Sequence, residues 1–242
     1  MINIAIDGPS GAGKSTLARR AAESLRYIYV DTGALYRTIA LFMLQRKIDP
    51  YDTVSVGNVL PMIDIAIKHV NGEQRVYLCG ENVSSVIRTP EVSKAASAVS
   101  ANPKVREYLA DLQEEMALNN NVIMDGRDIG TVILPDAQVK VFLTASPEVR
   151  AKRRYIELKE KGLDVDYEDI LASVKERDYA DSHRAIAPLR PADDAIILDT
   201  SDMDLDAALD ALLDIIDRKL KGTPIEGIPE NTFDDDFDDD EF

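Results

Sequence analysis

The amino-acid sequence predicts an α/β fold in which helices flank a five-stranded parallel sheet. Short, β-rich apolar runs alternate with helical patterns, which is typical of parallel strands joined by crossover helices. Between about residues 60 and 90 the pattern changes to β-branched residues around a "VNGE" turn signal, which predicts a small antiparallel insertion. At 242 residues, the chain has the length of one domain with an insertion or a tail.

Five runs are the candidate strands of the parallel sheet. Each is short and apolar, as expected for a strand buried on both faces. In chain order they are "INIAID" (2–7), "YIYVD" (27–31), "NVIMD" (121–125), "VKVFLTA" (139–145) and "AIILD" (195–199).

Helical patterns fill most of the remaining sequence. We expect helices at about 14–25, 34–47, 91–101 and 103–118. Ser146 is expected to cap a helix that has Pro147 at its first position, because hydroxyl side chains cap helices and proline suits the first turn. The last helix spans about 204–220, and its expected apolar stripe is Leu205, Leu209, Leu212, Ile216 and Leu220.

The composition excludes several classes of protein. The net charge is −16, and although "FDDDFDDDEF" supplies seven of the acidic side chains, the rest of the chain is still acidic. An acidic body is a poor binder of duplex DNA. The single cysteine, Cys79, rules out an internal disulfide and suits a reducing compartment. No apolar run reaches membrane-spanning length and "INIAIDGPS" does not read as a secretory signal, so a cytoplasmic protein is expected.

The stretch "GPSGAGKS" (8–15) matches the G-x-x-x-x-G-K-[ST] pattern of a phosphate-binding P-loop. It follows a predicted strand and opens a predicted helix, and this context argues against a glycine-rich turn that fits by chance. Lys14 can reach the β- and γ-phosphates, while the Ser15 hydroxyl can ligate Mg²⁺. The residues predicted to bind the nucleoside triphosphate are Gly8, Pro9, Ser10, Gly11, Ala12, Gly13, Lys14, Ser15 and Thr16.

A P-loop leaves the acceptor of the phosphoryl group open. The N-K-x-D motif of GTPases and an ABC-type signature are both absent from the sequence, and the chain is short for a motor or a helicase. A kinase of small molecules remains, so an acceptor pocket is expected.

Three polar stretches are candidates for that pocket. They are "DTGALYR" (31–37), "DGRDIGT" (125–131) and "RDYADSHR" (177–184). Two of them follow predicted strands, where open α/β sheets bind their ligands, and converging arginines suit a phosphate. Each also has a structural alternative: Asp31 as a helix cap only, Arg127 and Asp128 as a local surface pair, and the third stretch as an exposed helix face. The exposed-face alternative is disfavoured because the charged residues continue the helix face of Ile170 and Val174, which are apolar and should point inward.

Together these motifs resemble the bacterial-type cytidylate kinases, which are nucleoside-monophosphate kinases acting on CMP and dCMP. The resemblance covers residue 1 to about 215, in order, through "IAIDGPSGAGKST", "DTGALYR", "RTPEVSKAASAVSANPKVR", "DGRDIGTVILPDA" and "RDYADSHRAIAPLRPADDAIILDTS". It implies a P-loop kinase core with a nucleotide-binding insertion and a short lid. It also implies ATP as donor, Mg²⁺ as cofactor, and a monomer with no nucleic-acid or membrane partner.

The resemblance suggests boundaries within the chain. A single kinase domain at 1–222 would have its core at 1–59 and 119–222, a CMP-binding insertion at about 60–118 and a lid at about 148–165. The acidic segment 223–242 departs from the family pattern and is expected to be disordered.

Roles for individual side chains follow only from the resemblance. The CMP phosphate would be held by Thr32, Arg37, Arg127 and Arg184. Ser97, Arg106 and Asp128 would read the cytosine, and Arg177 and Asp181 would contact the ribose. Lid residues Arg150, Arg153 and Arg154 can close over ATP, although the sequence leaves open which of them enters the site. The expected catalytic side chains are Lys14, Arg127, Arg153 and Arg154, and no general base is needed because the acceptor phosphate is already anionic.

Two other functions are compatible with parts of the sequence. The same core can serve a kinase of UMP, AMP or another small acceptor. A P-loop binding module with the acidic tail as its contact is the alternative outside the enzymes, and the intact donor and acceptor motifs disfavour it.

Overall fold

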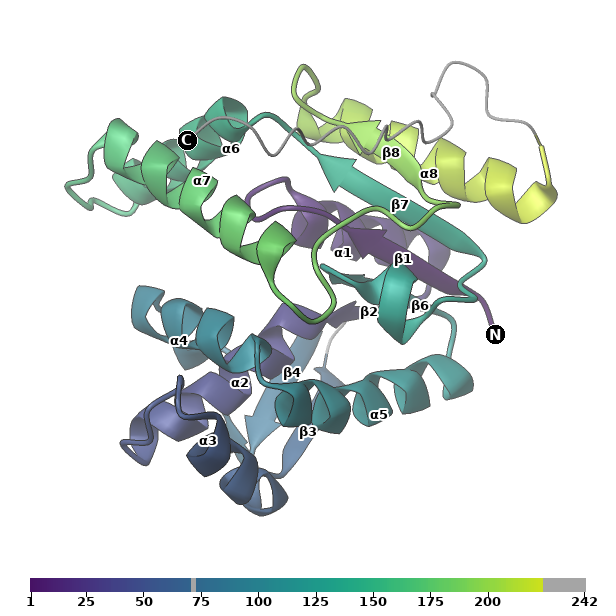
Figure 1. The fold of residues 1–242 in the computed structure, drawn as a ribbon. Coiled ribbons are helices and arrows are strands. Elements are labelled where there is room, and N and C mark those ends of the chain that lie inside the picture. The colour runs from purple at the N-terminus through teal and green to yellow at the C-terminus, as the bar shows by residue number, and fades with distance from the viewer. Residues whose placement is uncertain (71–72, 224–242) are drawn as a thin grey trace.

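The computed structural model describes residues 1–70 and 73–223, in which one five-stranded parallel sheet lies beside a smaller three-stranded antiparallel sheet (Figure 1). The order in the large sheet is β2-β6-β1-β7-β8. The predicted α/β class and all five predicted strands are therefore confirmed. The strands are β1 (Asn3–Asp7), β2 (Ile28–Asp31), β6 (Val122–Gly126), β7 (Val139–Thr144) and β8 (Ile196–Asp199).

The register of the parallel strands gathers acidic residues at one edge of the sheet. Asp7 at the end of β1 pairs with Gly126 of β6, and Asp31 at the end of β2 pairs with Asp125. Carboxyl ends of parallel strands meet at the same edge, which is where open α/β sheets bind ligands. The P-loop leaves β1 at this edge.

Helices cover each face of the large sheet. Successive side chains of a strand point to opposite faces, so the apolar strands need packing partners on both sides. Ile4 and Ile6 of β1 pack with α1 (Lys14–Leu25) and α8 (Leu205–Lys221). Ala5 lies in a second cluster with Ala117 of α5 (Pro103–Asn119) and with the π-helical turn η3 (Ile129–Ile133). The sheet core thus holds the P-loop and the segment after β6 in fixed positions.

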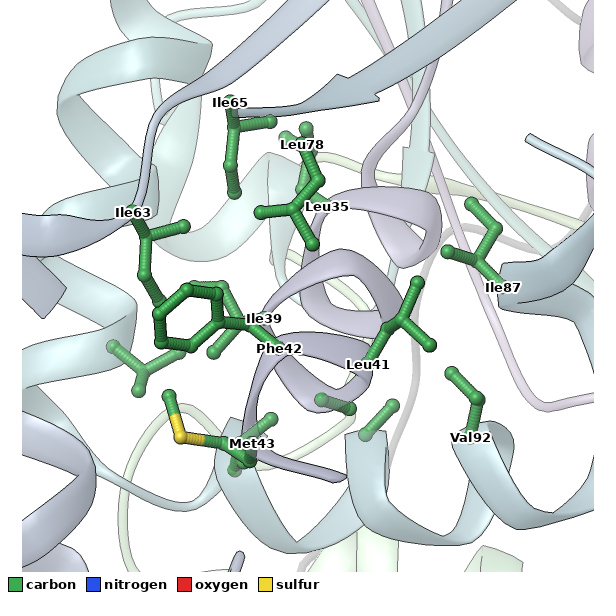
Figure 2. Packing of buried hydrophobic residues seen from close by; sticks show 14 of the residues in the cluster. Leu35, Ile39, Leu41, Phe42, Met43, Ile63, Ile65, Leu78, Ile87 and Val92 are labelled. Carbon is green, nitrogen blue, oxygen red and sulfur yellow. The ribbon is translucent and has the colours of Figure 1, made fainter. Parts of the chain in front are cut away.

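The small sheet has an apolar core of its own with α2 (Thr32–Gln45) (Figure 2). The sheet comprises β3 (Ile65–Val70), β4 (Glu73–Leu78) and β5 (Glu81–Asn82). The predicted hairpin is confirmed by the antiparallel pairing of β3 with β4, although the turn residues 71–72 lie outside the described residues. Around it lie α3 (Thr53–Val59), η1 (Leu60–Met62), η2 (Val86–Arg88) and α4 (Pro90–Ser100), of which the sequence analysis missed α3.

Two helices begin where their caps place them. Ser146 Oγ accepts a hydrogen bond of 3.3 Å from Val149 N at the start of α6 (Pro147–Glu160), as predicted. Helix α2 begins two residues earlier than predicted, because the Asp31 carboxylate accepts from Ala34 N at 2.9 Å and so caps it.

The predicted stripe of the last helix was wrong at both ends. Leu205 and Leu220 are exposed, and the buried face of α8 instead runs through Ala208, Leu212, Ile215 and Ile216. That i, i+4, i+7, i+8 spacing keeps one helix face against α1 and the sheet while both helix ends extend past it.

The described residues contain no helix with the length and apolarity needed to cross a membrane. The predicted disordered tail, 223–242, lies outside the described residues from residue 224 onward.

Candidate active site

The P-loop backbone requires glycine at its first position. Gly8 has φ +144°, and a Cβ there would lie 2.0 Å from the carbonyl oxygen of Leu143 on β7. Gly11 and Gly13 have φ of +79° and +94°, and Gly13 caps α1. The loop therefore has the left-handed turns that aim backbone N–H groups and the N-terminus of α1 at an anion.

Lys14 is held inside this loop. Its side chain is buried, and Nζ donates a hydrogen bond of 2.6 Å to the carbonyl oxygen of Pro9. Burial lowers the pKa of Lys14 well below its ordinary value, and Arg127 lowers it further, while Asp125 and Asp7 oppose the shift. A phosphate oxygen would offer the ammonium a charged acceptor in place of a carbonyl, which is a stronger hydrogen bond.

Ser15 contacts a carboxylate at the end of the neighbouring strand. Ser15 Oγ donates to Asp125 Oδ2 at 2.8 Å, and the Tyr29 hydroxyl donates to Asp125 Oδ1 at 2.8 Å. Burial raises the pKa of Asp125, as does the nearby Asp31. The sequence analysis placed Asp125 in a polar stretch but gave it no role.

These two groups fit a magnesium ion that is held mainly by the nucleotide. The described residues contain no group of three or more His, Cys, Asp or Glu side chains that could hold a metal by themselves. Mg²⁺ usually keeps several waters and binds one or two protein oxygens together with substrate phosphates. Ser15 Oγ and the Asp125 carboxylate are a donor set of that kind.

The arginines predicted to bind the acceptor lie beside aspartates rather than in solvent. Arg37 donates to Asp31 at 2.9 Å, Arg127 to Asp181 at 2.9 Å, and Arg184 to Asp128 at 3.3 Å. Three of the structural alternatives are therefore wrong. Asp31 does more than cap α2, because it also pairs with Arg37. Arg127 pairs with Asp181 instead of Asp128. In the third stretch, Arg177 and Arg184 are half-buried and Asp181 is buried. Buried Asp181 is joined to Arg127, 54 residues away.

Asp128 also accepts from Arg106, and both of these side chains are buried. The Arg106 guanidinium lies 5.9 Å from the ring centroid of Tyr36, whose pKa is raised to about 12, mainly by burial. The predicted base-reading pair Arg106–Asp128 is thus brought together. The sequence analysis did not name Tyr36. This tyrosine directly precedes Arg37 in "DTGALYR", and that position in a predicted site motif could have drawn attention to it.

Three predicted site residues have surroundings that the sequence did not indicate. Ser97 is exposed on α4, and no contact joins its side chain to this cluster within the described part of the chain. Thr32 is buried, and its hydroxyl donates to the Asp125 carbonyl at 2.7 Å. Arg184 follows the end of α7 (Tyr167–His183) instead of lying on the helix, and its Nε donates to the carbonyl of Ala187 at 2.5 Å.

Two guanidinium nitrogens of predicted acceptor residues have no hydrogen-bond partner in the part of the chain that the structure describes. Arg37 Nε and Arg177 Nε are both buried and make no hydrogen bond to any described residue. Burial lowers the pKa of Arg177, and the nearby Arg127 lowers it further, so the charged form of Arg177 carries an electrostatic cost. Buried donors without acceptors are rare and unfavourable, and an anionic ligand would satisfy them.

The three arginines predicted to belong to a lid have different surroundings. Arg154 is exposed and pairs with Glu157 within α6 at 2.8 Å. Arg153 donates to the carbonyl of Thr200 at 2.7 Å and approaches that of Ala12 in the P-loop at 3.5 Å. Arg150 is buried and pairs with Asp178 of α7. Of the three, Arg150 is the buried one, and it also donates to the carbonyl oxygen of Ser10 in the P-loop at 3.1 Å.

Comparison with known proteins agrees with this geometry. Residues 4–218 match the family profile described as cytidylate kinase. The cytidylate kinase of Caldicellulosiruptor bescii is 50% identical over 220 residues, which covers 91% of this chain and 97% of the relative. Cytidylate kinase 1 of Haemophilus influenzae is 48% identical, covering 89% and 93%.

Among solved structures, an uncharacterized protein from Eubacterium ventriosum has a TM-score of 0.51 at 14% identity, covering 90% of this chain and 99% of that one, and it supports the fold alone. The identity to the curated relatives, together with its coverage, shows the family. This chain belongs to the cytidylate kinase family, and it is a kinase.

Proposed function

We propose that the protein transfers the γ-phosphoryl group of ATP to CMP and dCMP, giving ADP with CDP or dCDP. One observation carries the proposal: Arg37 Nε and Arg177 Nε, which have no acceptor among the described residues, lie close to aspartate-paired arginines at the same end of the sheet as the P-loop. The cytidylate kinase relatives support the choice of acceptor.

When ATP binds, Lys14 would give up its hydrogen bond to the Pro9 carbonyl and bind the β- and γ-phosphates instead. Ser15 and Asp125 would hold Mg²⁺, which neutralises phosphate charge when bound. Arg153 and Arg154 would add positive charge as the lid, about 148–165, closes and excludes water.

The acceptor phosphate would bind Arg37, Arg127 and Arg184, with Thr32 beside them. An anionic oxygen of that phosphate attacks the γ-phosphorus, the new P–O bond forms, and the bond to the β-phosphate oxygen of ADP breaks. Positioning and charge stabilisation account for most catalysis of such transfers, so no general base is required.

The base and sugar would be read by groups outside the phosphate site. Cytosine offers an amine donor beside ring and carbonyl acceptors, and the buried Asp128 carboxylate and Arg106 guanidinium are complementary to them. Ser97 would join them if the insertion, 60–118, closes toward the core. Asp181 would accept from a ribose hydroxyl, with Arg177 alongside.

The test is ADP release with ATP, Mg²⁺ and one acceptor at a time: CMP, dCMP, UMP or AMP. Fast turnover with CMP and dCMP and little with AMP is expected. Preference for UMP or AMP would keep the kinase and overturn the base reading. ATP binding without turnover on any acceptor would leave a binding module.

A further inference from the structure

Helix α7 carries predicted acceptor-binding residues but buries little apolar surface. Among its 17 residues Asp181 is the one that is buried, while Ile170 and Val174 are half-buried. The helix lies against α6, over the end of the sheet that bears the P-loop (Figure 1). Since apolar burial contributes little, the position of α7 relative to that loop depends on polar contacts.

One guanidinium joins α7 to the P-loop. Arg150 is 3% exposed, and it donates to both Asp178 oxygens at 2.9 and 2.6 Å in a bidentate pair. The same side chain donates to the carbonyl of Ser10 in the P-loop at 3.1 Å and to that of Ala145 at 2.7 Å. All three of its nitrogens are thereby used in a fixed orientation.

The packing around Arg150 leaves little room for movement. A Cβ built at Gly11 would lie 3.3 Å from the Arg150 Cβ, so the P-loop backbone lies directly against this side chain. Asp178 follows Arg177 in the sequence and precedes Asp181 by one helical turn. A shift of Asp178 would therefore carry both predicted ribose contacts with it.

We propose that Arg150 and Asp178 are positioning residues that fix α7, and with it the acceptor nucleotide, relative to the phosphate-donor loop. The inference rests on the proposed function, because the role given to the Arg150–Asp178 pair is to set the distance between the donor and acceptor phosphates. Reacting atoms must be held about 3–3.5 Å apart, and a misplacement of about 1 Å can cost roughly 100-fold in rate.

The chain offers a matched control. Lys175 of α7 pairs with Glu148 of α6 at 3.3 Å, so this pair links the same two helices. Both of its side chains are more than half exposed, and neither contacts the P-loop in the described residues. Lys175→Ala therefore removes an ion pair between α6 and α7 without touching the Arg150–Asp178 pair.

The experiment compares Asp178→Ala, Asp178→Glu, Arg150→Lys and Lys175→Ala in the full chain. We expect Asp178→Ala to lower kcat at saturating ATP and CMP by about 10- to 100-fold. The Kd for ATP measured by calorimetry without acceptor should change much less. Asp178→Glu should recover part of the rate, whereas Arg150→Lys should not, since an ammonium cannot reproduce the bidentate pair. Lys175→Ala should match the wild type.

Hydrogen exchange supplies a readout that needs no turnover. Amides of 167–183 should exchange faster in Asp178→Ala than in Lys175→Ala, with the strands unchanged. A lower melting temperature with normal kcat, normal KM for CMP and unchanged exchange in α7 would overturn the proposal. If the wild type phosphorylates no acceptor, the proposed function fails, while the exchange comparison still decides whether the pair holds α7.

Discussion

The hydroxyl of Ser15 lies 2.8 Å from the carboxylate of Asp125, which is 110 residues further along the chain. The contact joins the P-loop to the end of β6 and makes one polar pair from two motifs that the sequence analysis treated separately. It also indicates which protein oxygens would take part in magnesium binding.

Asp125→Asn should raise the Mg²⁺ concentration needed for half-maximal activity by about 10- to 100-fold, the usual range for a lost supporting carboxylate. The measurement is a Mg²⁺ titration at fixed ATP and CMP. Ser15→Thr retains the hydroxyl and serves as the control. An unchanged Mg²⁺ dependence in Asp125→Asn would remove this residue from the metal site.

Lys14→Ala should abolish turnover, since it removes the buried amine that donates to the Pro9 carbonyl and that would reach the phosphates of ATP. Loss of one such charge-stabilising donor commonly costs about 10²- to 10³-fold in kcat. Single-turnover phosphoryl transfer from labelled ATP is the measurement, with melting temperature as the check on folding. Normal activity in this variant would refute the donor site.

Asp128→Ala should weaken the use of CMP more than the binding of ATP. It leaves Arg106 and Arg184 without their shared carboxylate, and a lost hydrogen bond to a charged group costs about 2 kcal/mol, or roughly 30-fold. KM for CMP and Kd for ATP are to be compared in the same preparation. Equal losses for both nucleotides would count against the base-reading role.

Asp7 should make stability depend on pH. Its carboxylate accepts from Ile129 N at 2.8 Å and Gly130 N at 2.7 Å, yet burial dominates and raises its pKa from 3.8 to about 6. The folded protein therefore keeps a proton there that the unfolded chain has already lost. As pH rises from about 4 to 6, the free energy of unfolding should fall by up to about 3 kcal/mol from this group.

Asp7→Asn removes that titration but leaves one backbone N–H facing an amide nitrogen, so it should be destabilising at every pH. Its deficit in the free energy of unfolding should shrink between pH 4 and 7, as measured by urea denaturation. Asp136→Asn, at an exposed position, is the control. A deficit that stays constant over this range would contradict the raised pKa.

Local patterns in the sequence were sufficient to predict the strands of the large sheet and the P-loop. The five parallel strands, the hairpin and the cap at Ser146 depend on residues close together in the chain, where periodicity and turn chemistry act directly. Helix α3 was missed because its seven residues are too few for a clear period, and it begins at the Asp52 cap, whose carboxylate accepts from Val54 N and Ser55 N.

Local motifs were enough to predict which kinds of residue the site would contain: glycines and a lysine for a triphosphate, and arginines with aspartates for an acceptor. The pairing of these residues could be read only from the folded chain. Arg127 with Asp181, Arg150 with Asp178 and Asp7 with the Ile129 amide each join segments that meet only through strand order and helix packing. The physical reason is that charged partners are chosen by distance and burial, which depend on the assembled fold, whereas helices, strands and turns follow from local backbone preferences.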